Sequence, residues 1–250
     1  LGIYSLDSKS GEYMEFTGNM SGALLCEYML SQLEEKGELK DNSAVTTTVV
    51  ITKLIRDICD RYGVYCDYNN LIGFKYIAAK IREYETTNSY SYVFGLEESY
   101  GCLPGTYARD KDAVGTVMLL CEAAAYYRDK GMTLWDKMMS LFEEYGYYRE
   151  NIETMTFEGK EGSEKIKSMI QQLRDNPISE LIDYKVEKVT DYLPKANMIL
   201  YELSDDAWFL VRPSGTEPKI KFYLGVKGNS LENSMDRINN LGSAVKALFS

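Results

Sequence analysis

The sequence predicts two folds in succession. The first is a three-layer α/β domain with a mixed or parallel sheet, and the second is an α+β domain whose antiparallel sheet is covered by helices on one side. Two observations predict this order. In the first part of the chain, β-branched and apolar strand-like segments alternate with helix-like segments. In the second part, several strand-like segments follow one another, with a helix before them and a helix after them.

Residues 1–42 form the first predicted segment. Two short strands are expected at 1–6 and 13–16, joined by a polar turn. A helix is expected next, because apolar residues recur at spacings of three and four, at Leu24, Leu25, Tyr28, Met29 and Leu33.

Residues 43–158 form the second predicted segment. It begins with the β-branched run Val45–Ile51, which is typical of a strand inside a parallel sheet. Residues 113–127 are apolar nearly all round and predict a buried helix. The remaining expected elements are helices at 53–62, 74–85 and 133–145 and strands at 64–66 and 90–94.

Residues 159–250 form the third predicted segment. A helix is expected at 163–174, and strands are expected at 184–189, 198–203, 207–211 and 219–226. In the last strand, apolar residues alternate with polar ones, which indicates one buried face and one exposed face. The final helix carries Met235, Ile238, Leu241, Val245 and Leu248 at helical spacing.

Composition excludes several classes of function. The formal net charge of -10 argues against nucleic acid as a partner, because duplex binding depends on a basic face. No apolar run reaches the roughly 18–20 residues of a membrane span, so no membrane partner is expected. The chain has no histidine, which removes His-based catalysis, and its five cysteines form no C-x-x-C pair. Reduced thiols of this kind are typical of a cytoplasmic protein.

A turn between two apolar strands carries the most informative residues. Its sequence, Arg212 to Lys221, places a guanidinium, two hydroxyls, a glycine and two lysines together in an acidic chain. A guanidinium matches two phosphate oxygens, hydroxyls add donors, and glycine lets backbone N–H groups approach. The pattern predicts a phosphate site made by Arg212, Ser214, Gly215, Thr216 and Lys221. An ordinary Pro-Gly turn bearing solubilising charges is the alternative.

A second loop, residues 95–105, follows the predicted strand at 90–94. The carboxyl ends of strands in an open α/β sheet are where ligands bind. Glu97 and Glu98 are adjacent carboxylates, and at least one should face solvent or a polar ligand such as a sugar hydroxyl. A solvated acidic loop is the alternative.

A third loop precedes the apolar helix. Asp110 or Asp112 can cap that helix, but capping does not explain the cations Arg109 and Lys111. A weaker candidate is the turn around Gly73 and Phe74, for which a plain entry into a helix is the favoured interpretation.

Together and in this order, the loops at 73–77, 97–101, 109–112 and 212–218 resemble those of the α-D-phosphohexomutase family, which includes phosphoglucomutase and phosphomannomutase. The resemblance covers the whole chain. It implies that residues 1–42 are the end of domain 2, that 43–158 are domain 3 and that 159–250 are domain 4 of a four-domain enzyme.

The resemblance also implies roles for individual residues. Glu97 and Ser99 would hold sugar hydroxyls, with Gly73 and Phe74 near the sugar. Lys111 would lie near the reacting phosphoryl group, for proton transfer or charge stabilisation. The phosphate would be gripped by the loop that contains Arg212, Ser214, Gly215, Thr216 and Lys221.

The family's phosphoserine nucleophile and its three Mg²⁺-binding aspartates match no segment of this sequence. We expect both upstream of Leu1, so that no metal is held here and the chain alone does not turn over. The reaction implied is interconversion of hexose 1-phosphate and hexose 6-phosphate through a hexose 1,6-bisphosphate. A pentose phosphate substrate and a non-catalytic sugar-phosphate-binding module are the alternatives. An incomplete domain 2 should be poorly packed, or should cover its sheet edge by self-association.

Overall fold

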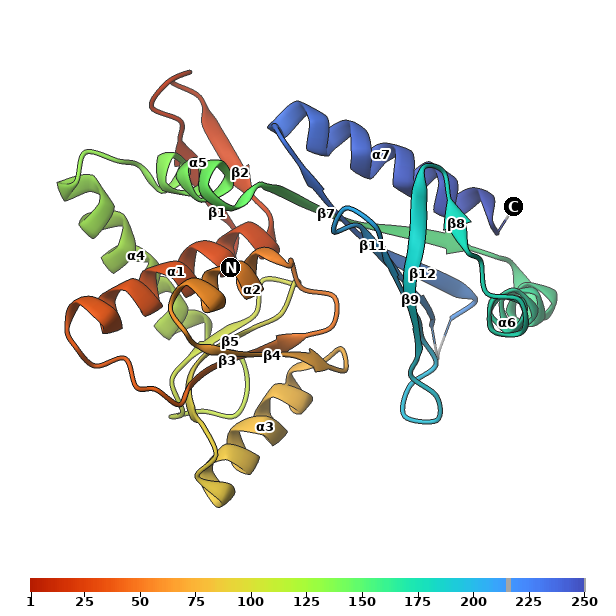
Figure 1. The fold of residues 1–250 in the computed structure, drawn as a ribbon, viewed down its shortest axis with the longest axis horizontal. Helices are drawn as coiled ribbons and strands as arrows, with labels where there is room; N and C mark the ends of the chain where they lie inside the picture. Colours follow the sequence, from red (N-terminus) through yellow and green to blue (C-terminus); the bar gives the residue numbers. More distant parts are fainter. Residues whose placement is uncertain (215–216, 250) are drawn as a thin grey trace. The chain divides into compact units, whose positions relative to one another are not determined.

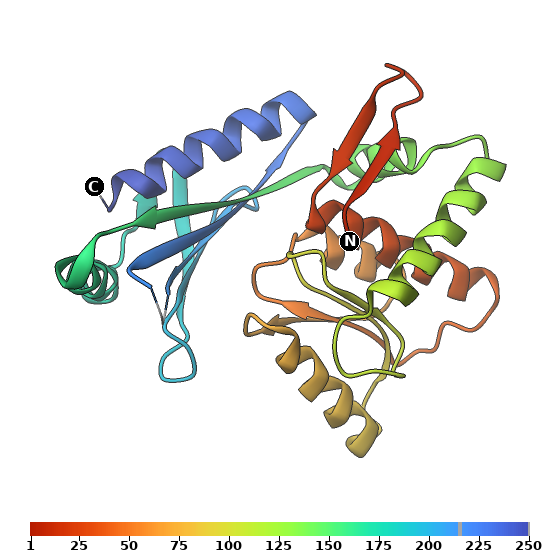
Figure 2. The same ribbon diagram turned by 180° about the vertical axis from the view of Figure 1, so that it is seen from behind.

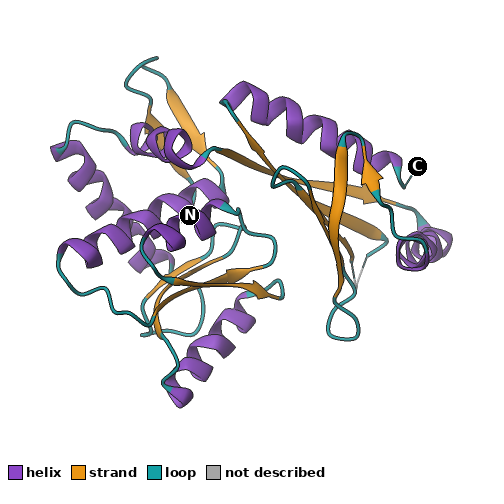
Figure 3. Ribbon diagram, in the orientation of Figure 1, coloured by secondary structure: helices purple, strands orange, loops and turns teal. Residues whose placement is uncertain are grey.

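The computed structural model describes residues 1–214 and 217–249, with only the backbone of Lys160. The chain forms two compact units, residues 1–145 and 146–250. Figure 1 shows the elements of both units, and Figure 3 distinguishes their helices and strands.

The first unit is built on a four-stranded mixed sheet in the order β4-β3-β5-β6. The central strand β3 (Ser43–Thr48) is buried along its whole length and runs parallel to β4 (Tyr65–Asn70) and β5 (Ser91–Leu96). The short strand β6 (Cys102–Pro104) pairs antiparallel with β5. The predicted parallel strands are therefore confirmed.

Helices cover both faces of this sheet, which gives the three predicted layers. Helices α1 (Gly18–Glu35) and α2 (Leu54–Arg61) lie on one face, and α3 (Phe74–Thr87) lies on the other (Figures 1 and 2). Helices α4 (Ala113–Asp129) and α5 (Leu134–Tyr145) complete the unit. The core under α3 contains Phe74, Ile77, Ile81 and Leu103.

The packing of residues 1–42 is uneven: helix α1 is largely buried, unlike the expected poorly packed segment, whereas residues 7–15 are mostly exposed. Self-association through this segment stays a prediction. Strands β1 (Ile3–Leu6) and β2 (Tyr13–Phe16) form a separate hairpin that contacts α5. The backbone N–H of Trp135 donates to Ser5 Oγ at 3.2 Å, and the rings of Phe16 and Trp135 meet edge to face. Helix α1 contributes Leu24 and other fully buried side chains.

Helix α4 departs from the prediction of a buried helix. Its buried residues are Thr116, Ala123 and Tyr127, whereas Val114 is 72% exposed and Met118 is 69% exposed. The helix lies beside β6 at the end of the sheet and touches α1 and α5, so only a narrow stripe of its surface is covered. Helix α4 is therefore buried on one side only, although its residues are apolar on nearly all sides.

The second unit is a six-stranded antiparallel sheet in the order β7-β12-β11-β10-β9-β8. Its helices α6 (Gly159–Asp175) and α7 (Leu231–Ala247) pack on the same face, where they share a core with Phe222 and Leu224. The strands are β7 (Tyr147–Thr156), β8 (Glu180–Leu181), β9 (Tyr184–Asp191), β10 (Ile199–Leu203), β11 (Trp208–Pro213) and β12 (Lys219–Gly228). This arrangement confirms the predicted α+β fold.

Strand β7 was not predicted, and it sets where the units divide. It pairs with β12 along its whole length, from Tyr147 opposite Gly228 to Thr156 opposite Lys219. The sheet of the second unit therefore includes residues 147–156, which the sequence placed at the end of the segment 43–158. The boundary between the two units in the chain falls between Tyr145 and Gly146.

Candidate functional site

Two cations, Arg212 and Lys221, lie on the face of the second unit's sheet that points away from α6 and α7. This face is buried near the middle of the strands and exposed at the end that carries the two cations, and we call this exposed end the open face. The two cations are direct partners across β11 and β12. Their neighbours Val211, Ile220 and Phe222 belong to the core beneath the helices. Because side chains alternate along a strand, Arg212 and Lys221 project from the opposite face. Both side chains are exposed.

The pairing of Arg212 with Lys221 has an electrostatic cost. Like charges directly opposite each other destabilise a sheet. Among residues 1–214 and 217–249, no carboxylate forms an ion pair with either cation. An anion with several oxygens would relieve this repulsion and accept hydrogen bonds from both groups. The predicted phosphate-binding pair is thus brought together in the structure.

The turn between these strands is held by its own backbone. The Ser214 N–H donates to the Lys219 carbonyl at 2.8 Å, and the Glu217 N–H donates to Ser214 Oγ at 3.3 Å. The carboxylate of Glu217 pairs with Lys219 at 3.1 Å. Two predicted site residues of this turn, Gly215 and Thr216, lie outside the described residues.

A second cluster forms in the first unit, where Gly73, Phe74, Glu97 and Lys111 come together. Glu97 directly follows β5 and is 7% exposed. Its Oε2 lies 3.8 Å from Lys111 Nζ, and the backbone N–H of Phe74 is near enough to the carboxylate to lower the pKa of Glu97. The same Nζ lies 5.6 Å from the centroid of the Phe74 ring. Gly73, with φ 123°, is the residue before α3 and makes the turn that aims this N–H.

The charges of this cluster shape each other's pKa values. Burial raises the pKa of Glu97, and the charge of Lys111 and the Phe74 N–H oppose that rise. A hydrogen bond from Lys111 to Asp110, together with the charge of Glu97, holds the pKa of Lys111 above its ordinary value. The ammonium is therefore charged at neutral pH. Its Nζ lies 3.0 Å from Asp110 Oδ1.

Close packing holds the Glu97 loop in place. A Cβ on Gly18 of α1 would lie 2.0 Å from the Glu98 carbonyl oxygen, and one on Gly101 would lie 2.4 Å from Lys111 Cδ. The Glu97 N–H donates to the Gly101 carbonyl at 2.8 Å. Ser99, the other predicted sugar-binding residue, is exposed in the same loop and lies outside the ion pair of Glu97 and Lys111.

The remaining charges of the third loop have structural partners. Asp112 caps α4 by accepting the N–H groups of Val114 and Gly115, as the capping interpretation expected. Arg109 makes a two-pronged contact with Glu85, at 2.6 and 2.7 Å.

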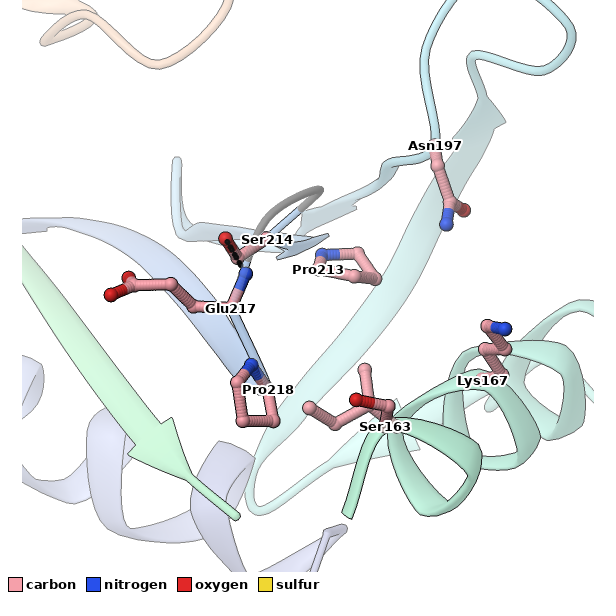
Figure 4. A pocket seen from close by; sticks show the side chains of 8 residues that line it. Ser163, Lys167, Asn197, Pro213, Ser214, Glu217 and Pro218 are labelled. Carbon is pink, nitrogen blue, oxygen red and sulfur yellow. Dashed lines mark hydrogen bonds between the residues drawn. The ribbon is translucent and has the colours of Figure 1, made fainter. Parts of the chain in front are cut away.

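A pocket in the second unit contains residues that the sequence did not indicate. It has a volume of about 390 Å³ and lies on the helix side of the 213–218 turn. Figure 4 shows Ser163 and Lys167 of α6 across from the turn, with Asn197 at the rim. These three come from a helix face and a loop that carry no recognisable motif.

Similarity to solved structures shows the fold. A Paramecium phosphoglucomutase, parafusin, in its open form matches with a TM-score of 0.66 at 14% identity, over 96% of this chain and 43% of that one. An Aspergillus fumigatus N-acetylphosphoglucosamine mutase, in complex with glucose 1,6-bisphosphate, matches with a TM-score of 0.52 at 14% identity, over 99% of this chain and 46% of that one. Each of the two units thus shares its fold, α/β or α+β, with these structures.

Two family models identify the chain more specifically. Residues 17–145 match the phosphoglucomutase/phosphomannomutase alpha/beta/alpha domain III, and residues 158–236 match the C-terminal domain of the same proteins. The chain belongs to the phosphoglucomutase/phosphomannomutase family. It is 34% identical over 248 residues to a phosphoglucomutase of Staphylococcus haemolyticus, a match that spans 92% of this chain and 44% of that protein. The domain III match begins at residue 17, inside the segment that the sequence assigned to domain 2.

No helix in the described part of the chain has both the length and the apolar character needed to cross a membrane.

Proposed function

We propose that this chain supplies the sugar- and phosphate-binding half of a phosphohexomutase that interconverts hexose 1-phosphate and hexose 6-phosphate, with glucose or mannose as the sugar. The observation that carries the proposal is the exposed, like-charged pair Arg212 and Lys221 on adjacent strands, next to the family's phosphate-loop sequence. Family membership and the clustering of Glu97 with Lys111 support it.

In the proposed reaction, a phosphoserine transfers its phosphoryl group to the free hydroxyl of the sugar phosphate. The product is a hexose 1,6-bisphosphate, which reorients and returns its other phosphoryl group to the serine. Positioning and charge neutralisation supply most of the catalysis in such transfers. Arg212, Ser214, Gly215, Thr216 and Lys221 would hold the phosphate that is not reacting.

Glu97 and Ser99 would hold sugar hydroxyls, with Gly73 and Phe74 beside the sugar. For Lys111 the raised pKa favours charge stabilisation of the transferring phosphoryl group over proton transfer, because an ammonium that stays charged is a poor base. The division of the chain into the end of domain 2, domain 3 and domain 4 remains part of the proposal, with the expected boundary at residue 158 moved to Gly146 because β7 belongs to the second unit. A cytoplasmic location is also part of the proposal.

The chain spans about half the length of the curated relatives that it matches, and we place the serine nucleophile and the Mg²⁺ ligands outside it. Among the described residues, no group of three or more acidic or sulfur side chains is arranged to hold a metal. We therefore expect the chain to bind a hexose phosphate but not to turn it over.

The test is calorimetric titration of the chain with glucose 6-phosphate, alongside an assay for glucose 1-phosphate conversion with Mg²⁺ and glucose 1,6-bisphosphate. We expect weak binding that Arg212→Ala removes and Arg212→Lys weakens, because lysine cannot make the two-pronged contact. Conversion by the chain alone would contradict the placement of the nucleophile. Ribose 1-phosphate in the same titration tests the pentose alternative.

A non-catalytic sugar-phosphate-binding module is the second candidate function. It predicts the same binding, so the discriminating test is complementation. Mixing the chain with a polypeptide that carries the remaining half of the homologous enzyme should restore conversion if the chain is part of a mutase. A binding module would leave that mixture inactive.

A further inference from the structure

Helix α4 carries a line of exposed side chains on the side opposite to its buried residues. The members of this line, at alternating spacings of four and three, are Val114, Met118, Cys121, Ala125 and Arg128. Side chains at these spacings lie along one side of a helix, as in the seam of a coiled coil. All five are exposed, and all but the last are apolar. We call this line the α4 stripe, and Figures 1 and 2 show the helix at the side of its unit.

A groove of about 430 Å³ lies beside the stripe, with Val114 and Met118 in its wall. Other lining residues with apolar surface are Pro104, Tyr107 and Leu119. The charged residues of the lining are Asp112 and Glu122, which are both carboxylates. A long side chain with an apolar stem and a cationic end suits such a groove, because its stem packs on the apolar wall and its charge meets a carboxylate.

Arg128 is a side chain of this kind, and it lies on the stripe itself. It is in the last turn of α4, and no carboxylate in the described part of the chain forms an ion pair with its guanidinium. Its neighbour Asp129 points to another side, because residues one apart on a helix do not face each other. Asp112 is roughly 24 Å away along the same helix, so one copy of the chain cannot bring the two charges together.

Asp112 lies at the opposite end of α4, as its N-cap residue. The cations beside it in the sequence have carboxylate partners within the same copy, Arg109 with Glu85 at 2.6 Å and Lys111 with Asp110 at 3.0 Å. The N-terminal end of α4 is therefore left with the charge of Asp112, and the C-terminal end with that of Arg128. Two copies of α4 packed antiparallel would bring these opposite charges together at both ends, and antiparallel helix dipoles attract each other.

We propose that the α4 stripe is a self-association surface, on which a second copy of the chain packs its own α4 antiparallel around a two-fold axis at Cys121. Val117 of one copy then faces Ala125 of the other. Arg128 of each copy lies in the groove of the other, with its stem on Val114 and its guanidinium at Asp112, and the two-fold axis makes this contact occur twice. A contact confined to one pair of helices is small, so the association is weak. The inference does not depend on the proposed mutase reaction.

Disulfide cross-linking of the full chain tests the axis. Cys66→Ser removes the other cysteine that is not buried. Diamide oxidises two thiols, taking their hydrogens onto its N=N bond as the S–S bond forms. It should link Cys121 to Cys121 of a second copy, because a two-fold axis there brings their Cα atoms within the roughly 7 Å that a disulfide spans.

A pair of introduced cysteines separates this geometry from random collision. In a background of Cys66→Ser and Cys121→Ser, Val117→Cys with Ala125→Cys should link two copies, because these positions face each other across the axis. Each substitution alone should not, since its counterpart on the second copy lies roughly 12 Å away along the helix. Equal linkage in the single and double variants, or no linkage through Cys121, would overturn the proposed packing.

Sedimentation equilibrium of the reduced chain tests the charges. Arg128→Glu should raise the dissociation constant of the dimer about tenfold, because the contact occurs twice and each becomes repulsive. The matched control is Arg82→Glu, the same change of charge at an exposed position of α3, and it should leave the constant within about twofold. Circular dichroism checks that both variants keep their helices. A chain that stays monomeric at about 1 mM, or equal effects of the two substitutions, would overturn the inference.

Discussion

Lys111 Nζ lies 3.8 Å from Glu97 Oε2, and the two groups differ sharply in exposure. The Glu97 side chain is 8% exposed and the Lys111 side chain is 46% exposed. The carboxylate is thus desolvated at the end of β5, while the ammonium that partly compensates for it can still meet a ligand from solvent. This asymmetry suits a site where a lysine exchanges one anionic partner for another.

The pH dependence of stability should report this pair. Because burial raises the pKa of Glu97, the folded protein holds that proton to a higher pH than the unfolded chain, whose Glu titrates near about 4.3. Between the two pKa values the folded state binds more protons. The free energy of unfolding therefore decreases as pH rises through that window.

Removing the lysine charge should enlarge the effect. Lys111→Met should raise the pKa of Glu97 further, because the opposing charge is lost. The measurement is a ¹³C NMR titration of the Glu97 carboxyl carbon, with urea unfolding from pH 4 to 7. Lys9→Met, an exposed change in the β1–β2 turn, is the control. A Glu97 pKa that falls or stays constant in Lys111→Met would contradict the interpretation of the pair.

The open-face cations should cost stability. Lys221→Thr removes a like charge opposite Arg212 and adds a β-branched residue, so it should raise the free energy of unfolding by roughly 0.2–1 kcal/mol. The same change should weaken glucose 6-phosphate binding. Urea unfolding followed by Trp208 fluorescence in a Trp135→Phe background reports on the second unit.

A matched change is available in β9, three strands along the sheet from β12. Lys188→Thr in β9 removes a lysine whose cross-strand partner is Glu202, at 3.2 Å, so it should not stabilise the unit. If Lys221→Thr and Lys188→Thr shift stability equally, strand propensity alone explains the gain. The electrostatic cost assigned to the open face would then be wrong.

The contact between Gly18 and Glu98 should be intolerant of a side chain. Gly18→Ala would place a Cβ 2.0 Å from a backbone oxygen that cannot swing away, so α1 or the Glu97 loop must move. We expect a loss of about 1–3 kcal/mol in the free energy of unfolding, as in other overpacked sites. Gly2→Ala, which meets no atom within 4 Å, should be neutral. An unaltered stability in Gly18→Ala would show that the loop is held elsewhere.

The sequence predicted β3 from a β-branched run and β12 from its alternation of apolar and polar residues. Strand β7 was not predicted because it is an edge strand with little burial, and charged residues such as Arg149 and Glu150 interrupt its alternation of apolar and polar residues. Helix α4 was predicted to be buried because it is apolar on nearly all sides. Composition alone does not show whether other elements are present to cover those sides. In both cases, burial depended on which other elements pack against the strand or the helix.

For the candidate site, the residues that belong to sequence motifs could be predicted. Gly73, Phe74, Glu97 and Lys111 come from three separate loops, and the sequence alone does not show that these loops lie close together. Asn197 depends on a chain of contacts through Arg174 and Asp191, and such a chain follows from three-dimensional packing and not from spacing. Lys167 is one of several lysines in α6, and only the position of the turn beside the helix shows that this lysine lines the pocket.

The exposed side of α4 should drive association of the chain at high concentration. Val114 and Met118 are more than two-thirds exposed, and together with Val117 they form an apolar surface on one helix. Val114→Thr with Met118→Gln should reduce self-association in sedimentation velocity, with a change in stability within about 0.5 kcal/mol because both residues are on the surface. The comparison is Tyr4→Ser with Tyr13→Ser in the β1–β2 hairpin, at positions 65% and 71% exposed. If the hairpin variant becomes monomeric and the α4 variant does not, residues 1–42 mediate the association, as the sequence predicted.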